Sequence, residues 1–314
     1  RGPPPHHTIQ LAGILRLGLY FTGPPYGVGR MMNHRILRLA IGISVVISIL
    51  ITSFAILPGW IHTWGAAADE ITRQYPGDEL ISDASVIWTH GIGINATPEE
   101  VWPWVAQIGD RRAGFYSYTF IENLIAGEKM YVNANHLIPE YQEPVIGGWL
   151  IEEMLRVEDF QPDSYLLGYY NLEDFFSWTW SWNLFKSAEG TTRLVMRMRI
   201  GAPQEGGGDM GLAGSLIDVS GFVMERRMLQ GIKDRSEGRV DPPFSELIEI
   251  VLWLAALCIG LLAGMLTLRK GNNWPLALSA GIDSIIVLMV LTFVQPPLWI
   301  RALLDIVLLG ALWL

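Results

Sequence analysis

The chain has 314 residues, of which 50% are hydrophobic, and its formal net charge at pH 7 is −9. This length is sufficient for one substantial core together with membrane-spanning segments. The negative charge argues against a nucleic-acid-binding protein, because neutralising phosphates needs a basic domain. The single cysteine, Cys258, excludes an intrachain disulfide.

The first 30 residues differ in composition from the rest of the chain. Residues 1–30 are rich in proline and glycine, and they precede Met31 and Met32. We expect this segment to be a disordered tail or an upstream translation artefact, with the natural start at one of the two methionines.

Residues 31–60 are predicted to form an N-terminal membrane anchor. The run from Ile36 to Leu57 is almost wholly apolar and is uncharged except for Arg38, and about 20 such residues suffice to cross a bilayer. Basic residues precede this run and acidic residues follow it, which places the N-terminus in the cytoplasm and the next domain outside. A cleaved signal peptide is the alternative, because small residues follow the run. The length of the run favours the uncleaved anchor.

Residues 80–240 are predicted to form a folded domain, preceded by a linker at 61–79. At 175–185, large apolar and small polar residues alternate, which is typical of a strand with one buried face. A short turn connects it to a second alternating segment at 191–200, so we expect an antiparallel hairpin. Further strands are predicted at 85–94, 148–154 and 164–170.

Two short helices are expected within this domain. Thr97 and Glu100 have the spacing of a capping box, with Pro98 at the first helical position between them. Pro103 should limit or kink this helix. The second helix is predicted at 115–127, where the final glycine would close it.

A long amphipathic helix is predicted from Leu212 to Arg235. Its charged residues, among them Glu225, Arg226 and Arg227, are expected to face water. A sheet with one apolar face must be covered. We therefore expect this helix to lie in a curved sheet and to leave a cavity between them.

Residues 246–314 are predicted to form about three transmembrane helices. The first runs from Leu247 to Leu268, the second from Trp274 to Val294, and a third candidate starts near Leu298. The chain stops inside an apolar run, which is typical of a truncated sequence.

Apart from Glu249 at the start of the first run, three charges fall inside these apolar runs: Asp283, Arg301 and Asp305. Intramembrane charges are costly and are often functional. We favour a structural pair, either Asp283–Arg301 or Arg301–Asp305, over an ion or proton path.

Four segments of the folded domain carry a resemblance to a known family. They are INATPEEVWPWVAQIGDRRAGFYSYTFIENLIAG, NANHLIPEYQEPVIGGW, WTWSWNLF and GFVMERRMLQGIKDRSEG. In this order they resemble the START-like superfamily, also called SRPBCC or Bet v 1-like, and in particular its polyketide cyclase/dehydrase-like branch. The resemblance covers about 80–238 and leaves out the membrane segments.

The resemblance implies an α+β helix-grip fold, in which an antiparallel sheet wraps around a long C-terminal helix. The complete chain would add all-α transmembrane segments to this fold. Members of the superfamily hold lipids, sterols, polyketides or other apolar molecules in an internal cavity, and a minority are enzymes. Fold alone does not assign the chemistry.

The residues predicted to contact a ligand form two groups. The first lies in the stretch that would close one mouth of the cavity and consists of Tyr116, Tyr118, Glu122 and Asn123. The alternative for this group is ordinary helix-start packing, with Glu122 paired to Arg111 or Arg112. The second group lies on the strands and the long helix and consists of Phe176, Trp178, Trp180, Trp182, Met196, Met198 and Phe222. Such apolar residues are equally typical of a packed core or of an adaptable cavity.

The sequence carries no metal-ligand spacing, no nucleophile motif, no phosphate loop and no dinucleotide motif. We therefore predict neither a metal nor a cofactor and assign no catalytic residue. The favoured function is a membrane-tethered binding domain whose partners are the membrane and a lipid or other hydrophobic small molecule.

Two other functions are compatible with the same residues. One is a cyclase- or dehydratase-type enzyme, for which Glu122, Tyr116, Tyr118 and His90 are the candidate acids and bases. The other is a ligand sensor or assembly module coupled to the membrane helices.

Overall fold

The computed structural model describes residues 34–126, 132–172, 176–201, 211–240, 242, 244–269 and 273–313. The predicted tail at 1–30, the two candidate start methionines and the helix-closing Gly127 lie outside the described residues.

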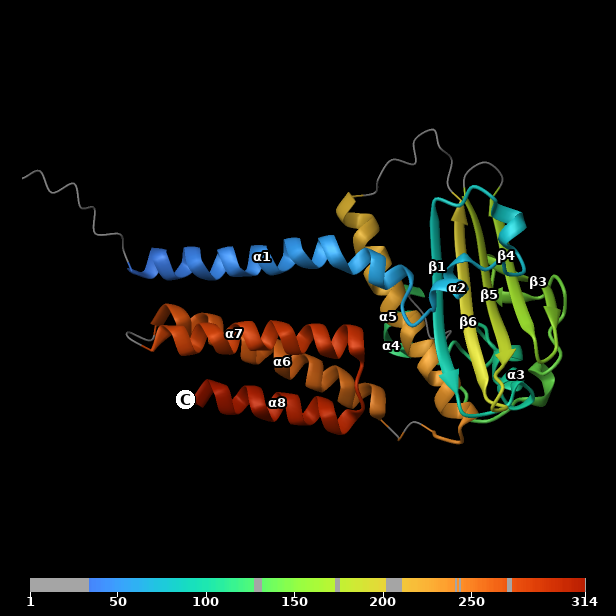
Figure 1. The fold of residues 1–314 in the computed structure, drawn as a ribbon. Helices are drawn as coiled ribbons and strands as arrows, with labels where there is room; N and C mark the ends of the chain where they lie inside the picture. Colours follow the sequence, from blue (N-terminus) through green and yellow to red (C-terminus); the bar gives the residue numbers. More distant parts are fainter. Residues whose placement is uncertain are drawn as a thin grey trace, which may run out of the picture.

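A six-stranded antiparallel sheet forms the framework of the folded domain (Figure 1). Its strands are β1 (Val86–Ile94), β2 (Trp149–Ile151), β3 (Leu155–Gln161), β4 (Tyr165–Leu172), β5 (Phe176–Lys186) and β6 (Thr192–Gly201). They lie in the order β1-β6-β5-β4-β3-β2. The predicted β5–β6 hairpin is confirmed, with Trp180 opposite Met198. Strand β3 was missed because a bulge between Val157 and Asp159 interrupts its alternation.

Both faces of β5 are buried, so the prediction of one buried face for this strand is wrong. Thr179, Ser181 and Asn183 on the outer face are at most 3% exposed. The short helix η1 (Asp78–Ile81), at the end of the segment expected to be a linker, contacts β5 and β6, and α2 (Ala68–Thr72) lies beside β6.

Arginine side chains hold η1 on the sheet. The Arg197 Nε atom donates to Asp78 Oδ1 at 3.1 Å, and the Arg199 Nε atom donates to the Ile81 carbonyl at 2.9 Å. Both arginines are buried. Their charge is compatible with burial because each has oxygen acceptors in η1.

The two short helices of the domain are α3 (Pro98–Ala106) and α4 (Thr119–Ala126). The backbone N–H of Thr97 donates to Glu100 Oε2 at 2.8 Å, which is the predicted capping contact. Helix α3 continues past Pro103. Helix α4 begins four residues later than predicted, because the preceding chain turns through Tyr116, whose φ is +58°.

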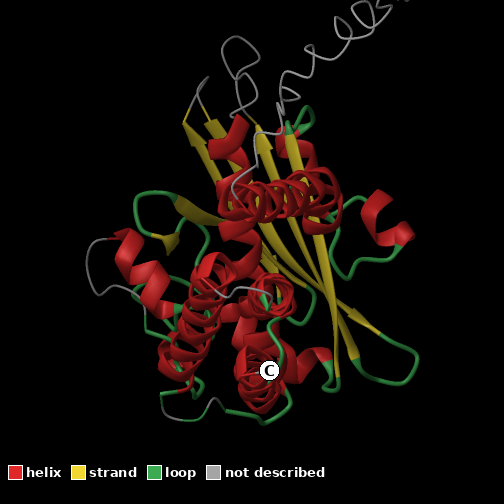
Figure 2. Ribbon diagram, turned by 90° about the vertical axis from the view of Figure 1, so that its left-hand side faces the viewer, coloured by secondary structure: helices red, strands yellow, loops and turns green. Residues whose placement is uncertain are grey.

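The long helix α5 (Gly211–Ser236) lies between the sheet and the membrane helices (Figure 1). One side of α5 packs on β1, and the other side contacts α1 (His34–His62). In Figure 2, which looks along the membrane helices, the helices lie in front of the strands. Helix α5 therefore has protein on two sides and lacks the wide solvent face of an ordinary amphipathic helix.

This placement overturns the expectation that the charged residues of α5 face water. Glu225 and Arg226 are 6% and 8% exposed. The Arg226 guanidinium donates to the Val294 carbonyl at 2.6 Å, and Glu225 Oε2 lies 2.8 Å from His90 Nδ1. Arg227 lies 3.4 Å from Glu249. Arg226 and Arg227 contact the membrane helices, which pack where solvent was expected, whereas Glu225 is buried against β1.

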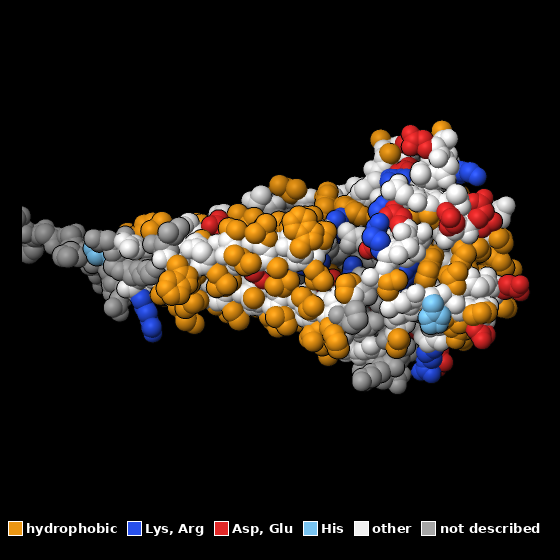
Figure 3. All heavy atoms as spheres, turned by 90° about the horizontal axis from the view of Figure 1, so that it is seen from below, with side chains coloured by type: hydrophobic (Ala, Val, Ile, Leu, Met, Phe, Trp, Pro, Cys, Tyr) orange, Lys and Arg blue, Asp and Glu red, His pale blue; other side chains and the backbone are white. Residues whose placement is uncertain are grey.

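Three helical segments of the described residues are long and apolar enough to cross a membrane: Ile36–His62, Ser245–Arg269 and Trp274–Val294. The last of these comprises α7 (Trp274–Met289) and the π-helical segment η3 (Val290–Val294) that continues it. Helix α8 (Leu298–Trp313) has 16 residues and packs on α6 (Ser245–Arg269) and α7. Hydrophobic side chains cover the surface of this helical part, whereas most charged side chains gather on the sheet domain (Figure 3).

Arg301 pairs with neither of its predicted partners. Its guanidinium lies 3.1 Å from Glu249 Oε2 of α6, because the start of α6 adjoins the start of α8. Asp283 is exposed on α7. The carboxylate oxygens of Asp305 are buried and have no hydrogen-bond partner among the described residues. The predicted pairs Asp283–Arg301 and Arg301–Asp305 are therefore wrong.

Gly231 provides the first test of the packing around α5. A Cβ atom at this position would lie 2.6 Å from Tyr116 Cβ and would also meet the Tyr116 carbonyl oxygen. We expect Gly231→Ala to destabilise the protein by about 1–3 kcal/mol, because buried backbone cannot move aside without strain. Thermal unfolding of the full chain in detergent, followed by tryptophan fluorescence, measures this loss.

Gly264→Ala in α6 is the matched control, because no described atom outside the local helix backbone lies within 4 Å of its would-be Cβ. It should be neutral or slightly stabilising, since alanine favours helix more than glycine does. Equal melting temperatures of the two variants would contradict close packing of α5 on the Tyr116 segment.

Candidate functional site

A cavity of about 460 Å³ lies between the inner face of the sheet and α5. We call it the sheet–helix cavity. Strands β5 and β6 supply aromatic and methionine side chains to it, α5 supplies its second wall, and the segment at 115–122 closes one side. Its volume lies in the range of about 300–1,000 Å³ that is typical of small-molecule sites.

Five of the predicted ligand-contacting residues line this cavity. They are Glu122, Phe176, Trp178, Trp180 and Met198. The indole rings of Trp178 and Trp180 stack with 5.4 Å between centroids, and Phe115 stacks with Trp180 at 5.7 Å. These rings form a continuous aromatic wall.

Three residues predicted for the cavity belong to the closed core instead. Trp182 and Met196 are opposite each other on β5 and β6 and are completely buried, because α3 covers that end of the sheet. Phe222 points toward the membrane helices, where its ring lies 4.9 Å from Trp60 and 6.2 Å from Phe293. None of the three lines the sheet–helix cavity.

The remaining predicted residues do not line the cavity either. The Tyr116 hydroxyl is buried, accepts from Gln107 Nε2 at 2.9 Å and donates to the Trp104 carbonyl at 3.0 Å. The Tyr118 hydroxyl donates to Glu249 Oε2 at 3.0 Å. Burial raises the pKa of Tyr118 to about 12, and the Glu249 carboxylate contributes to the same effect. Asn123 is half-buried and lies outside the cavity.

Several cavity residues were missed in the sequence. Trp88 lies two residues before His90 in β1, so both side chains point to the same side of the strand. The inward position of Trp88 could therefore have been predicted from the strand pattern. The helix wall is formed by Asp218, Gly221, Glu225 and Met228, which follow one face at helical spacing. This face combines acidic, small and apolar residues, so hydrophobic periodicity did not reveal it.

Glu122 is the most isolated polar group of the site. Its side chain is 5% exposed, and its Oε2 atom has no hydrogen-bond partner among the described residues. Burial raises the pKa of Glu122 to about 7, and the Glu246 carboxylate adds to the effect. The alternative pairing with Arg111 or Arg112 does not form, since Arg111 contacts Glu152 and Arg112 donates to the Ala106 carbonyl.

Two further carboxylates line the cavity from α5. Asp218 Oδ2 lies 3.3 Å from His62 Nε2, and Glu225 Oε2 lies 2.8 Å from His90 Nδ1. Burial raises the pKa of Glu225, although the nearby imidazole opposes the effect. The cavity wall contains no lysine or arginine among the described residues.

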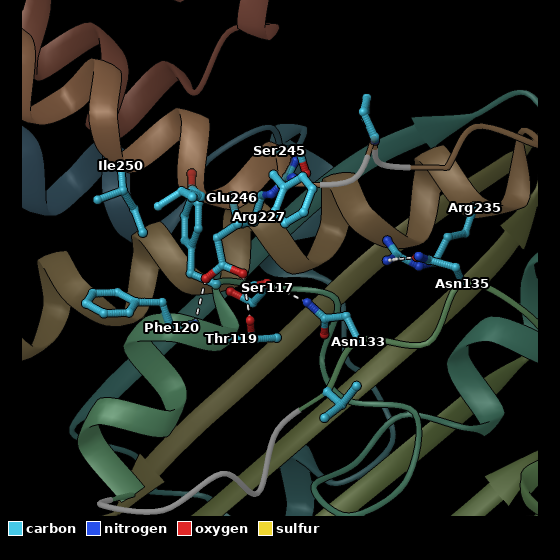
Figure 4. A pocket seen from close by; sticks show the side chains of 15 residues that line it. Ser117, Thr119, Phe120, Asn133, Asn135, Arg227, Arg235, Ser245, Glu246 and Ile250 are labelled. Atoms are coloured by element: carbon cyan, nitrogen blue, oxygen red, sulfur yellow. Dashed lines mark hydrogen bonds between the residues drawn. The ribbon is translucent and has the colours of Figure 1, made fainter.

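A second pocket, of about 700 Å³, lies between α4, the C-terminal half of α5 and the start of α6 (Figure 4). We call it the interface pocket. Glu246 accepts from the Thr119 hydroxyl and from the Phe120 backbone N–H, both at 2.6 Å. Asn133 donates to the Ser117 carbonyl at 2.7 Å. These polar groups of the interface pocket therefore have partners within the protein.

The sheet–helix cavity and the interface pocket differ in whether their polar groups have hydrogen-bond partners. In the sheet–helix cavity the indole N–H groups of Trp88, Trp178 and Trp180 are buried and find no acceptor among the described residues. Buried donors and acceptors are normally paired, and unpaired ones need a specific explanation. Ser117 lines both spaces. The sheet–helix cavity is the candidate site, because it is apolar and retains unsatisfied polar groups.

The described residues contain no group of three or more histidine, cysteine, aspartate or glutamate side chains placed to hold a metal ion. The site can enclose an apolar body, donate hydrogen bonds from indole rings and offer carboxyl groups.

No protein-family model and no curated protein matches the chain. Solved structures similar to it include a protein from Mesorhizobium loti, with 13% identity, 49% of this chain and 99% of that chain covered, and a TM-score of 0.29. A hypothetical protein from Helicobacter pylori has 10% identity, coverage of 52% and 95%, and a TM-score of 0.32. A conserved protein of unknown function from Enterococcus faecalis has 11% identity, coverage of 67% and 95%, and a TM-score of 0.26. These scores are too low to support an argument by similarity.

Proposed function

We propose that this protein is a membrane-tethered binding protein for a hydrophobic small molecule or lipid, held in the sheet–helix cavity. The observation that carries the proposal is the set of unsatisfied polar atoms in its apolar wall: three indole N–H groups and Glu122 Oε2. A bound molecule with complementary polar groups would pair them and recover the desolvation cost. The START-like, helix-grip character suggested by the sequence is part of the same proposal, since a sheet, a long helix and a cavity between them are its essential features.

The membrane helices would keep the cavity next to a reservoir of apolar ligands. The basic residues Arg38 and Arg269 lie near the ends of α1 and α6 that are remote from the sheet (Figure 1). By the positive-inside rule, those ends face the cytoplasm and the sheet domain faces outward. The Arg38 guanidinium lies 5.7 Å from the Trp274 ring centroid, which agrees with α1 and the start of α7 reaching the same membrane surface.

Catalysis is the second candidate, and Glu122 favours it. A general acid or base works best with a pKa near the operating pH, and burial brings the pKa of Glu122 to about 7. The other proposed acids and bases, Tyr116, Tyr118 and His90, lie outside the cavity wall. A sensor role draws support from α5, which contacts both the cavity and the membrane helices.

Native mass spectrometry of the full chain released from detergent tests the proposed function. We expect a co-purifying apolar molecule, and we expect Trp180→Ala to weaken its binding about 10–100-fold, as removal of 1.5–3 kcal/mol of apolar contact would do. The full chain is required, because removing the membrane helices would uncover Arg226 and Phe222.

Trp299→Ala is the matched control, because this indole is 69% exposed on α8 and lies outside the cavity. It should retain the bound molecule. Protein without any bound apolar mass, and without saturable uptake of added apolar probes, would contradict the proposed function.

A further inference from the structure

The charges in the wall of the sheet–helix cavity have one sign. Asp218 and Glu225 lie two turns apart on one face of α5, and Glu122 faces the same space from α4. The described wall contains no lysine or arginine. An anionic ligand, such as a fatty acid, would therefore meet like charges without a fixed positive partner.

Among the described residues, Glu122 has no positive partner, and Asp218 and Glu225 have histidine partners only. Glu122 Oε2 is buried and has no hydrogen-bond donor among the described residues. Asp218 and Glu225 are contacted by His62 and His90, which carry a charge only when protonated. A buried carboxylate needs a donor or a positive charge to compensate for the loss of water.

The aromatic residues of the wall also suit a ligand that carries a positive charge. Trp88, Trp178 and Trp180 line the cavity together with Phe115. Indole faces attract cations, and aromatic cages are a recurrent solution for binding quaternary ammonium groups. The unpaired indole N–H groups can also donate to an uncharged oxygen on the ligand.

We infer that the ligand of the sheet–helix cavity is a hydrophobic molecule bearing an ammonium group, which sits among Glu122, Asp218 and the indole rings. This inference rests on the proposed function and names the chemical class of its ligand. A cavity of about 460 Å³ is in the range of drug-sized ligands, which favours a single-chain or ring-bearing amine over a complete two-chain lipid.

Three probes that share a naphthylmethyl group, the first two also matched in shape, test the inference on the full chain in an uncharged detergent at pH 8. They are (2-naphthylmethyl)trimethylammonium, its uncharged carbon isostere 2-neopentylnaphthalene, and the anion 2-naphthylacetate. Equilibrium dialysis against protein-free micelles measures saturable binding. We expect the ammonium probe to bind at least tenfold more tightly than the isostere and the anion to bind most weakly.

Removing the carboxylate charges from the cavity wall is the second test of the inference. In the double variant Glu122→Gln with Asp218→Asn, the ratio of ammonium to isostere affinity should fall at least tenfold, because shape is kept and charge is lost. Glu158→Gln on the exposed side of β3 is the matched control and should keep the ratio.

The outcomes distinguish failure of the ligand class from failure of the proposed function. Saturable binding in which the isostere equals the ammonium probe, or the anion binds best, would overturn the ligand class and leave the proposed function intact. No saturable binding of any probe would overturn both. Competition by a choline-headgroup phospholipid would assign the ammonium to a lipid, whereas failure to compete would assign it to a small amine.

Discussion

Replacing Glu122 with glutamine is expected to stabilise the ligand-free protein at pH 8 by roughly 3 kcal/mol. The folded-state pKa of Glu122 is about 7, above its ordinary value of 4.5, because burial penalises the carboxylate. The folded state therefore binds a proton more tightly than the unfolded state does. Stability conferred by the wild-type side chain is complete below pH 4.5 and is lost as the pH rises to about 7.

The neighbouring charges reinforce this effect. Glu246 of α6 raises the pKa of Glu122, and Asp218 and Glu225 of α5 face the same cavity. A glutamine cannot ionise, so the variant should exceed the wild type at pH 8 and match it at pH 4. Thermal unfolding of the full chain in detergent across this range measures the difference. A gain of equal size at both pH values would show that packing, and not ionisation, is responsible.

Replacing Glu249 with alanine is expected to cost about 3–5 kcal/mol, a large share of the stability of most proteins. Glu249 of α6 accepts a hydrogen bond from Tyr118 and lies within 3.4 Å of Arg227 and 3.1 Å of Arg301. It thus connects the sheet domain, α5 and α8. Its removal takes a counterion away from the buried Arg301 and from the largely buried Arg227, which is much costlier than losing a surface pair.

Matched variants make this prediction specific. Glu249→Gln keeps an acceptor for Tyr118 but removes the charge, so its melting temperature should lie between those of the wild type and the alanine variant. Glu143→Ala removes an exposed carboxylate and should change stability little. If Glu249→Ala melts like Glu143→Ala, then the contact between domain and membrane helices does not depend on this cluster.

The sequence by itself determined the elements whose physics is local. Three membrane-length helices follow from uninterrupted apolar runs, because a bilayer requires every backbone polar group to be paired within the helix. The β5–β6 hairpin follows from strict alternation on both sides of a short turn. The start of α3 follows from a capping pair three residues apart.

Only the tertiary structure decided which faces are buried and which residues form the cavity. Trp180 and Trp182 point to the same side of β5, yet α3 closes the core around Trp182 and leaves Trp180 at the cavity. Arg226 looked solvent-exposed because its partner, the Val294 carbonyl, is 68 residues away in the chain. Periodicity reports that a face is apolar or polar, but it does not report which elements pack against that face. Burial, and with it the charge and reactivity of a site, depends on neighbours that are distant in sequence.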